Sequence, residues 1–159
     1  MNLTKRMQKR AAHVLEPGEH YVGALSVGPP GATAYSANPG GAMGAVGAFA
    51  RAAEEAAADP GVWLDVPMEG FILGLTNRRL LIFDQSFLGL PQELLVEAPR
   101  ANIHLEIDHT KAGPFGRART YHLRTDQGQY VSVEANTSGP AAKRADRFEA
   151  AWAATPEGP

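Results

Sequence analysis

The chain of 159 residues is long enough for one domain with a hydrophobic core of its own. Its 44% hydrophobic and 20% charged residues are typical of a globular protein, and a net charge of −2 gives no overall attraction to nucleic acid or to an acidic membrane. The sequence has no cysteine, which excludes disulfide scaffolds, thiolate zinc sites and cysteine nucleophiles. Because no stretch approaches the ~20 apolar residues of a membrane-spanning helix and no secretory signal is recognisable, we expect a cytoplasmic protein.

Residues 1–15 are predicted to form a basic N-terminal helix or arm. Apolar residues recur there at spacings of four and three, which predicts one buried stripe of Leu3, Met7, Ala11 and Val14. The helix ends before Pro17-Gly18, and four of its polar positions are basic: Lys5, Arg6, Lys9 and Arg10. These cations are candidates for contact with anionic lipid or nucleic acid, for docking on the acidic residues of segment 54–69, or for simple solvation.

Residues 16–153 are predicted to form a single domain that carries a long insertion, residues 28–68, after its first strand. The insertion begins with a loop rich in proline and glycine and continues over residues 42–59 as a helix rich in alanine and glycine. Small residues four apart allow another helix to approach closely. Three interpretations remain open for this segment: packing on the domain, a seam for self-association or a protein partner, and partial membrane insertion. The candidate binding residues are Gly40, Gly44, Gly47 and Phe49.

Seven short segments have the composition and the alternation of β-strands, and turn residues separate them. They are residues 20–27, 70–75, 80–83, 93–97, 103–109, 119–125 and 129–134. A three-residue loop that ends in Gly128 joins the last two as a hairpin. Because seven antiparallel strands have to close or fold over to protect their edges, we expect a strongly bent antiparallel barrel.

An amphipathic helix is predicted to follow the last strand. Thr137 or Ser138 can cap its N-terminus, and Pro140 falls near its first turn, where a missing N–H is harmless. The apolar positions form a single stripe of Ala141, Ala145, Phe148 and Trp152. We therefore expect this helix to cover the open end of the barrel with its two aromatic side chains, and residues 154–159 to form a frayed tail.

The stretch GFILGLTNRRLLIFD, the following ELLVEAPRANIHLEID and the last strand hairpin resemble the bacterial pleckstrin-homology-like (PH-like) domains. These domains share an lT-x-x-R-L-x-x-F hairpin, which corresponds to residues 75–83 here, and the resemblance covers roughly residues 16–153. It implies a PH-like bent seven-stranded barrel capped by a C-terminal helix, with a binding or scaffold role of uncharacterised function. Eukaryotic relatives often hold phosphoinositides with a basic cluster between the first two strands. In this chain that connection contains Arg51 as its one basic residue.

Arg78 and Arg79 form the last candidate binding site. An arginine fork fits a phosphate or carboxylate group, so the pair is a candidate anion contact. The structural interpretation, which we favour, is a tight hairpin corner in which Asn77 tolerates the left-handed conformation and exposed arginines keep the corner hydrated. Arg79 then has three candidate ion-pair partners: Asp65, Glu69 and Asp84.

His104, Glu106 and Asp108 alternate along one face of a predicted strand and superficially resemble a metal-ligand triad. Three successive outward residues span ~13 Å, too far for all of them to reach one ion, so we expect a solvated face. An approach of His122 to His104 is the one arrangement that would restore a metal site. The chain contains no catalytic signature and no phosphate-binding glycine loop, so we expect no enzymatic activity, metal or cofactor.

These features predict a non-catalytic binding or scaffold module that acts through a protein partner or through self-association as an oligomer. The first alternative is a peripheral membrane adaptor that contacts anionic lipid weakly through the basic arm. The second alternative is a small-ligand or hydrolytic pocket at the mouth of the barrel. Nucleic acid is not an expected partner, because the net charge is slightly negative.

Overall fold

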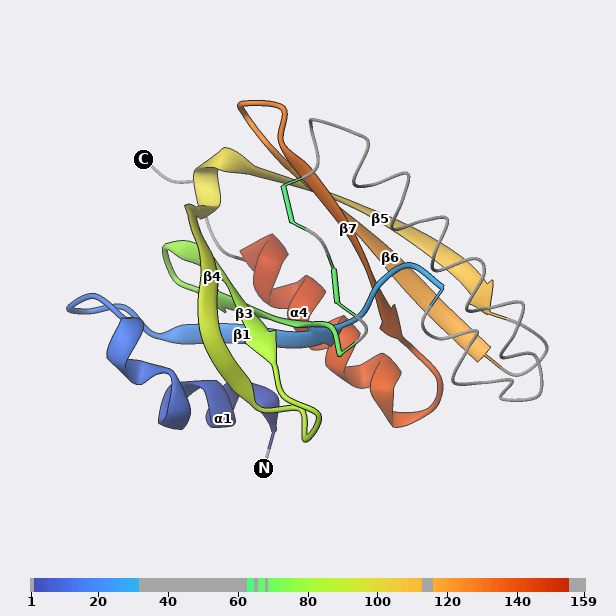
Figure 1. The fold of residues 1–159 in the computed structure, drawn as a ribbon, viewed down its shortest axis with the longest axis horizontal. Coiled ribbons are helices and arrows are strands. Elements are labelled where there is room, and N and C mark those ends of the chain that lie inside the picture. The colour runs from blue at the N-terminus through green and yellow to red at the C-terminus, as the bar shows by residue number, and fades with distance from the viewer. Residues whose placement is uncertain (1, 32–62, 65, 68, 113–115, 155–159) are drawn as a thin grey trace.

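The computed structural model describes residues 2–31, 63–64, 66–67, 69–112 and 116–154 (Figure 1). Within these residues, seven strands form a four-stranded and a three-stranded sheet, both antiparallel. The elements in chain order are α1 (Leu3–Arg10), η1 (Ala12–Val14), β1 (Tyr21–Val27), β2 (Phe71–Thr76), β3 (Arg79–Gln85), β4 (Pro91–Pro99), η3 (Arg100–Asn102), β5 (Ile103–Ala112), β6 (Gly116–Thr125), β7 (Tyr130–Asn136) and α4 (Pro140–Ala154). The protein is therefore mainly β, with a C-terminal helix.

The first sheet has the strand order β1-β2-β3-β4. Every residue of β2 is buried, because this sheet is covered on both faces. Successive side chains of a strand point to opposite faces, so Phe71 and Leu73 enter the central core while Ile72 enters a second cluster beneath α1. This double coverage explains the continuous apolar runs of β2 and β3.

Helix α1 covers the outer face of the first sheet (Figure 1). Met7 is fully buried and Ala11 is nearly so, and Leu3 and Val14 are partly buried beside them, which confirms the predicted stripe. The α-helix stops at Arg10, and the predicted continuation is the 3-10 helix η1. The sheet residues under the helix are Tyr21, Ala24, Ile72, Leu81 and Phe83.

The second sheet has the order β5-β6-β7, and one core joins its inner face to the first sheet and to α4. Phe148 of α4 is fully buried and meets the Tyr121 ring of β6 edge to face, with ring centroids 6.2 Å apart. Trp152 follows one turn later in the same core, and Ala145 precedes them. Ala145, Phe148 and Trp152 of the predicted apolar stripe therefore face the core as expected, whereas Ala141 is only partly buried.

The two sheets meet at one corner and do not form a closed barrel from the described ladders. Gly28, after β1, makes an isolated antiparallel bridge to Glu134 of β7, with both N–H···O distances at 2.8 Å. At the other side Pro99 ends β4, and η3 redirects the chain before β5 begins. In the described residues β4 therefore pairs with β3 alone and β5 with β6 alone, so the sheets fold over a shared core. The expected bent antiparallel barrel is therefore confirmed only as two antiparallel sheets over a shared core.

All seven predicted strands are present, and the predicted hairpin turn is confirmed. Gly128 has a φ of +84°, and Thr125 N donates to the Gln129 carbonyl at 2.8 Å. Strands β5 and β6 are longer than expected, because their pairing continues to Ala112 and Gly116. The helix predicted over residues 42–59 lies outside the described residues, as do residues 155–159 of the predicted tail.

Alanine substitutions at two glycines distinguish the energetic cost of a left-handed backbone from the cost of a steric clash. Gly70 and Gly128 have φ of +80° and +84°, but a Cβ at Gly70 would lie 2.0 Å from the Val27 carbonyl oxygen, whereas one at Gly128 would meet nothing within 4 Å. We expect Gly128→Ala to reduce the free energy of unfolding by about 1–2 kcal/mol through backbone strain. Gly70→Ala should cost at least about 2 kcal/mol more, because backbone atoms have to move. Equal losses in urea denaturation would contradict this account of the β1–β2 corner.

Candidate functional site

The four basic residues of α1 are all exposed to solvent. Lys5, Arg6, Lys9 and Arg10 all belong to this exposed set. No ion pair between described residues involves any of them. Lys9 and Arg10 lie in the last turn of α1, where cations interact favourably with the helix dipole. The helix therefore presents four positive charges to solvent from a fixed position on the first sheet.

Three of these cations share a hollow with the turn between β3 and β4. The hollow has a volume of about 520 Å³, and it is lined by Arg6, Lys9, Arg10, Leu88 and Leu90. Its cationic wall comes from α1, and its apolar wall comes from a segment more than seventy residues later in the chain (Figure 1). This juxtaposition of positive charge and exposed apolar surface is the feature that we take as the candidate functional site.

The β3–β4 turn, residues 86–90, carries the most exposed large apolar side chains of the described chain. Phe87 is 95% exposed and Leu88 is 75% exposed. Gly89 adopts a φ of +70°, and its N–H donates to the Ser86 carbonyl at 2.8 Å. Ser86 N in turn donates to the Leu90 carbonyl at 2.9 Å, which closes a tight hairpin turn.

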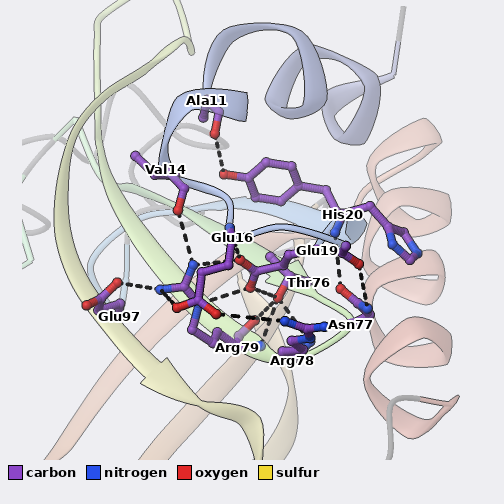
Figure 2. A network of polar contacts seen from close by, with 12 residues as sticks. Ala11, Val14, Glu16, Glu19, His20, Thr76, Asn77, Arg78, Arg79 and Glu97 are labelled. Atoms are coloured by element: carbon purple, nitrogen blue, oxygen red, sulfur yellow. Dashed lines mark hydrogen bonds and ion pairs between the residues drawn. The ribbon is translucent and has the colours of Figure 1, made fainter.

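A polar network fixes the connection between α1 and β1 on the first sheet (Figure 2). Arg79 donates from Nε to Glu19 Oε1 at 2.9 Å and from Nη2 to Glu19 Oε2 at 2.6 Å. The same guanidinium donates to the Val14 carbonyl at 3.1 Å and pairs with Glu97 of β4. A bidentate arginine–carboxylate pair is both strong and directional, so it ties the end of η1 to the β2–β3 corner.

Glu19 is charged although its side chain is fully buried. Burial alone would raise the pKa of this carboxyl group, but hydrogen bonds from Arg79, from the Glu16 backbone N–H and from the Thr76 hydroxyl outweigh burial and lower the pKa to about 2. The hydrogen bond with Glu19 also raises the pKa of Arg79. The carboxylate and the guanidinium therefore stabilise each other's charged forms.

Arg78 and Arg79 have different environments. The side chain of Arg79 is 13% exposed, and among described residues its ion-pair partners are Glu16, Glu19 and Glu97. The predicted pairs with Glu69 and Asp84 are absent from the described ion pairs, and Asp65 lies outside the described residues. Arg78 is 51% exposed and pairs only loosely with Glu16, at 3.8 Å. The fork of Arg79 is therefore occupied within the protein, because the chain segment before β1 brings acidic groups to it.

The predicted left-handed conformation of Asn77 is wrong, since no described non-glycine residue has a positive φ. The corner is organised by Thr76 instead, whose Oγ1 accepts from Arg78 N at 3.1 Å and from Arg79 N at 2.8 Å. Asn77 joins the corner to the segment before β1, because its Oδ1 accepts from His20 N at 3.1 Å.

The outer face of the second sheet carries a row of hydrogen-bonded polar side chains beside a hollow of about 460 Å³. His122 bonds Asp108 through Nε2 at 2.9 Å and Ser132 through Nδ1 at 2.7 Å. His104 bonds Asp126 at 2.6 Å, so the two histidines do not converge on one site. Within the described residues no cluster of three or more His, Asp and Glu side chains is arranged to hold a metal ion.

Asp108, His122 and Ser132 are the residue types of a hydrolase triad, but here they lie on an exposed sheet face. Asp108 is 72% exposed, so water competes for its hydrogen bond to His122. We interpret the row as cross-strand pairs that stabilise an exposed sheet face.

Of the described residues that were predicted to form sites, only Arg6, Lys9 and Arg10 of α1 are brought together with another exposed feature. Gly40, Gly44, Gly47 and Phe49 lie outside the described residues. Sequence reasoning missed the apolar turn. A signal for it exists, because the segment SFLGLP places three large apolar residues between two predicted strands, where turns normally carry polar ones.

Comparisons of the chain with protein-family models, with curated protein sequences and with solved structures found no match. None of the helices that the structure describes combines the length and the apolar character needed to cross a bilayer. The functional interpretation therefore depends on the geometry of the described residues.

The depressed pKa of Glu19 predicts how stability depends on pH. The pKa is about 2 in the folded chain against 4.5 ordinarily, so the stabilisation is complete above pH 4.5 and is lost as the pH falls toward 2. We expect Glu19 to account for about 2 kcal/mol of the loss of unfolding free energy between pH 7 and pH 3. Urea denaturation of the wild type and of Glu19→Gln at both pH values measures this difference. The same pH dependence in both proteins would refute the assignment.

Proposed function

We propose that the chain is a cytoplasmic, non-catalytic binding module with a PH-like fold that attaches reversibly to anionic lipid bilayers through α1. The seven antiparallel strands and the C-terminal helix packed on their core are consistent with the PH-like resemblance. A role in self-association or protein binding through the glycine-rich insertion remains a prediction from the sequence, because that segment lies outside the described residues.

The observation that carries the proposal is the fixed cationic face of α1. Its four charges are exposed and have no ion-pair partner among the described residues. An anionic leaflet attracts basic residues at its surface by about 1 kcal/mol per charge. Four such charges on one short helix supply enough attraction for reversible attachment, and salt should weaken it.

The net charge of −2 does not oppose this proposal, because electrostatic attraction to a bilayer is local. The Debye length at physiological salt is about 8 Å, so charges on the far side of the domain are largely screened from the leaflet. The chain has no acidic residue before Glu16, and α1 has none at all. The surface that would face the bilayer is therefore strongly positive even though the whole protein is not.

Neutralising the cations of α1 should release the protein from anionic vesicles. We expect Arg6→Gln/Lys9→Gln/Arg10→Gln to weaken binding on the order of 100-fold, since three charges contribute about 1 kcal/mol each and each 1.4 kcal/mol is a factor of ten. Co-sedimentation with phosphatidylglycerol-containing vesicles at low salt measures the change, and vesicles of phosphatidylcholine alone should bind poorly.

Helix α4 provides a matched control, since Lys143, Arg144 and Arg147 are also exposed. The variant Lys143→Gln/Arg144→Gln/Arg147→Gln removes the same charge from another element and should bind nearly as well as the wild type. The proposal fails if the wild type stays in the supernatant at low salt, or if the two triple variants lose affinity equally.

A further inference from the structure

Phe87 and Leu88 form an exposed apolar tip that the fold leaves without a partner among the described residues. They are adjacent in the chain and are 95% and 75% exposed. The other exposed large apolar residue of the described chain, Leu95, is only 40% exposed. Single exposed apolar residues are common on proteins, whereas contiguous exposed apolar surface makes a candidate interaction site.

The tip is a rigid hairpin turn. The Ser86 and Leu90 main chains are joined by the bond from Ser86 N to the Leu90 carbonyl, and Leu90 N donates to Ser86 Oγ at 3.1 Å. Gly89 donates to the Ser86 carbonyl and supplies the left-handed residue that the turn needs. These bonds satisfy part of the turn's backbone internally, which lowers the cost of moving it out of water. They also fix the backbone of the turn before binding, so little backbone conformational entropy is lost on contact.

The tip lies next to the cations of α1. Leu88 and Leu90 line the same hollow as Arg6, Lys9 and Arg10, and the turn and the helix lie at the same end of the molecule (Figure 1). A basic patch alone binds a membrane weakly, and stable attachment generally requires a second, apolar contribution. The surface formed by α1 and the β3–β4 turn provides both the basic and the apolar contribution on one folded domain.

The charge around the tip determines which occupant fits. In a symmetric dimer the same patch faces its copy, which would bring the cations of two α1 helices together around the tips. Like charges that face each other across an interface are unfavourable, so a second copy of the chain fits poorly. An anionic bilayer provides negative headgroups for the cations and, a few ångströms deeper, an apolar layer for Phe87 and Leu88.

We propose that the β3–β4 turn is a membrane-insertion element, in which Phe87 and Leu88 enter the acyl boundary of an anionic leaflet while α1 contacts the headgroups. This inference rests on the proposed function, and it adds to the membrane affinity an apolar contribution that salt does not screen. The electrostatic component brings the protein to the surface, and the apolar tip slows its release.

The absence of native cysteine allows the depth of the tip to be measured directly. Leu88→Cys carries an environment-sensitive nitrobenzoxadiazole label, and Gln127→Cys is the matched control on the exposed β6–β7 turn, which lies at the top of Figure 1 while α1 lies at the bottom. With phosphatidylglycerol-containing vesicles, the label at residue 88 should shift to the blue and be quenched by shallow spin-labelled lipids. The label at residue 127 should show neither change.

A pair of serine variants measures the contribution of the tip to affinity. We expect Phe87→Ser/Leu88→Ser to weaken vesicle binding at least about tenfold, because burial of one large apolar side chain alone contributes that factor. The loss should persist at about 1 M salt, where the Debye length is roughly 3 Å. Leu95→Ser, which removes an exposed leucine from β4, should bind like the wild type. Thermal melting of each variant checks that the fold is retained.

The outcomes separate this inference from the proposed function. If the wild type sediments with anionic vesicles but the label at residue 88 keeps its aqueous spectrum, or the double serine variant binds as well as the wild type, the insertion element is refuted and the electrostatic attachment stands. If the wild type does not sediment at all, both proposals fail. A tip that binds a protein instead would leave the label unchanged by vesicles, which also overturns the inference.

Discussion

The pair between Arg79 and Glu19 is the interaction on which the position of α1 depends. Helix α1 is only eight residues long, too short to be stable in water without tertiary contacts. Its buried side chains attach it to the first sheet, while the Arg79 fork fixes the segment that links it to β1. A buried carboxylate without its arginine would be strongly unfavourable, so the two groups keep each other in place.

The same constraint determines how the cations of α1 act. A flexible basic tail would lose conformational entropy each time it contacted a surface, whereas a docked helix has already lost it on folding. Tyr21 adds to the anchoring, because its hydroxyl donates to the Ala11 carbonyl at 3.1 Å and its N–H donates to Gln8. The polar network therefore serves the candidate surface indirectly, by holding the helix that presents the charges.

The strands and the amphipathic helices could be predicted from the sequence, because their signals are local. The period of two in β5, the stripe that contains Phe148 in α4 and the glycine at the β6–β7 turn depend on residues within one turn or one strand of each other. The buried face of α1 was predictable for the same reason. The contact between the two sheets was not, since the shape of the η3 turn decides whether β4 and β5 pair.

The partners of Arg79 could not be predicted, because Glu19 lies sixty positions away and Val14 contributes a carbonyl that any residue would supply. The candidate surface could not be predicted either, because it also joins segments that lie far apart in the sequence. The cations of α1 were identifiable as charges, but their proximity to the β3–β4 turn depends on how α1 packs across β3. Exposure of Phe87 is also a property of the fold, since an apolar residue after a strand is more often buried.

Strand β3 connects the Arg79–Glu19 pair with the candidate surface. At its start, Arg79 pairs with Glu19 and bonds the carbonyl of Val14, just beyond the C-terminal end of α1. At its other end the chain enters the turn that brings Leu88 beside the cations of the helix. Between them, Leu81 and Phe83 pack in the cluster that contains Met7. Strand β3 therefore contributes both to the position of the helix and to the position of the apolar tip, and the first sheet fixes the distance between charge and apolar surface. A surface whose two components are held on one sheet acts as a unit, which is the property that simultaneous contact with headgroups and acyl chains requires.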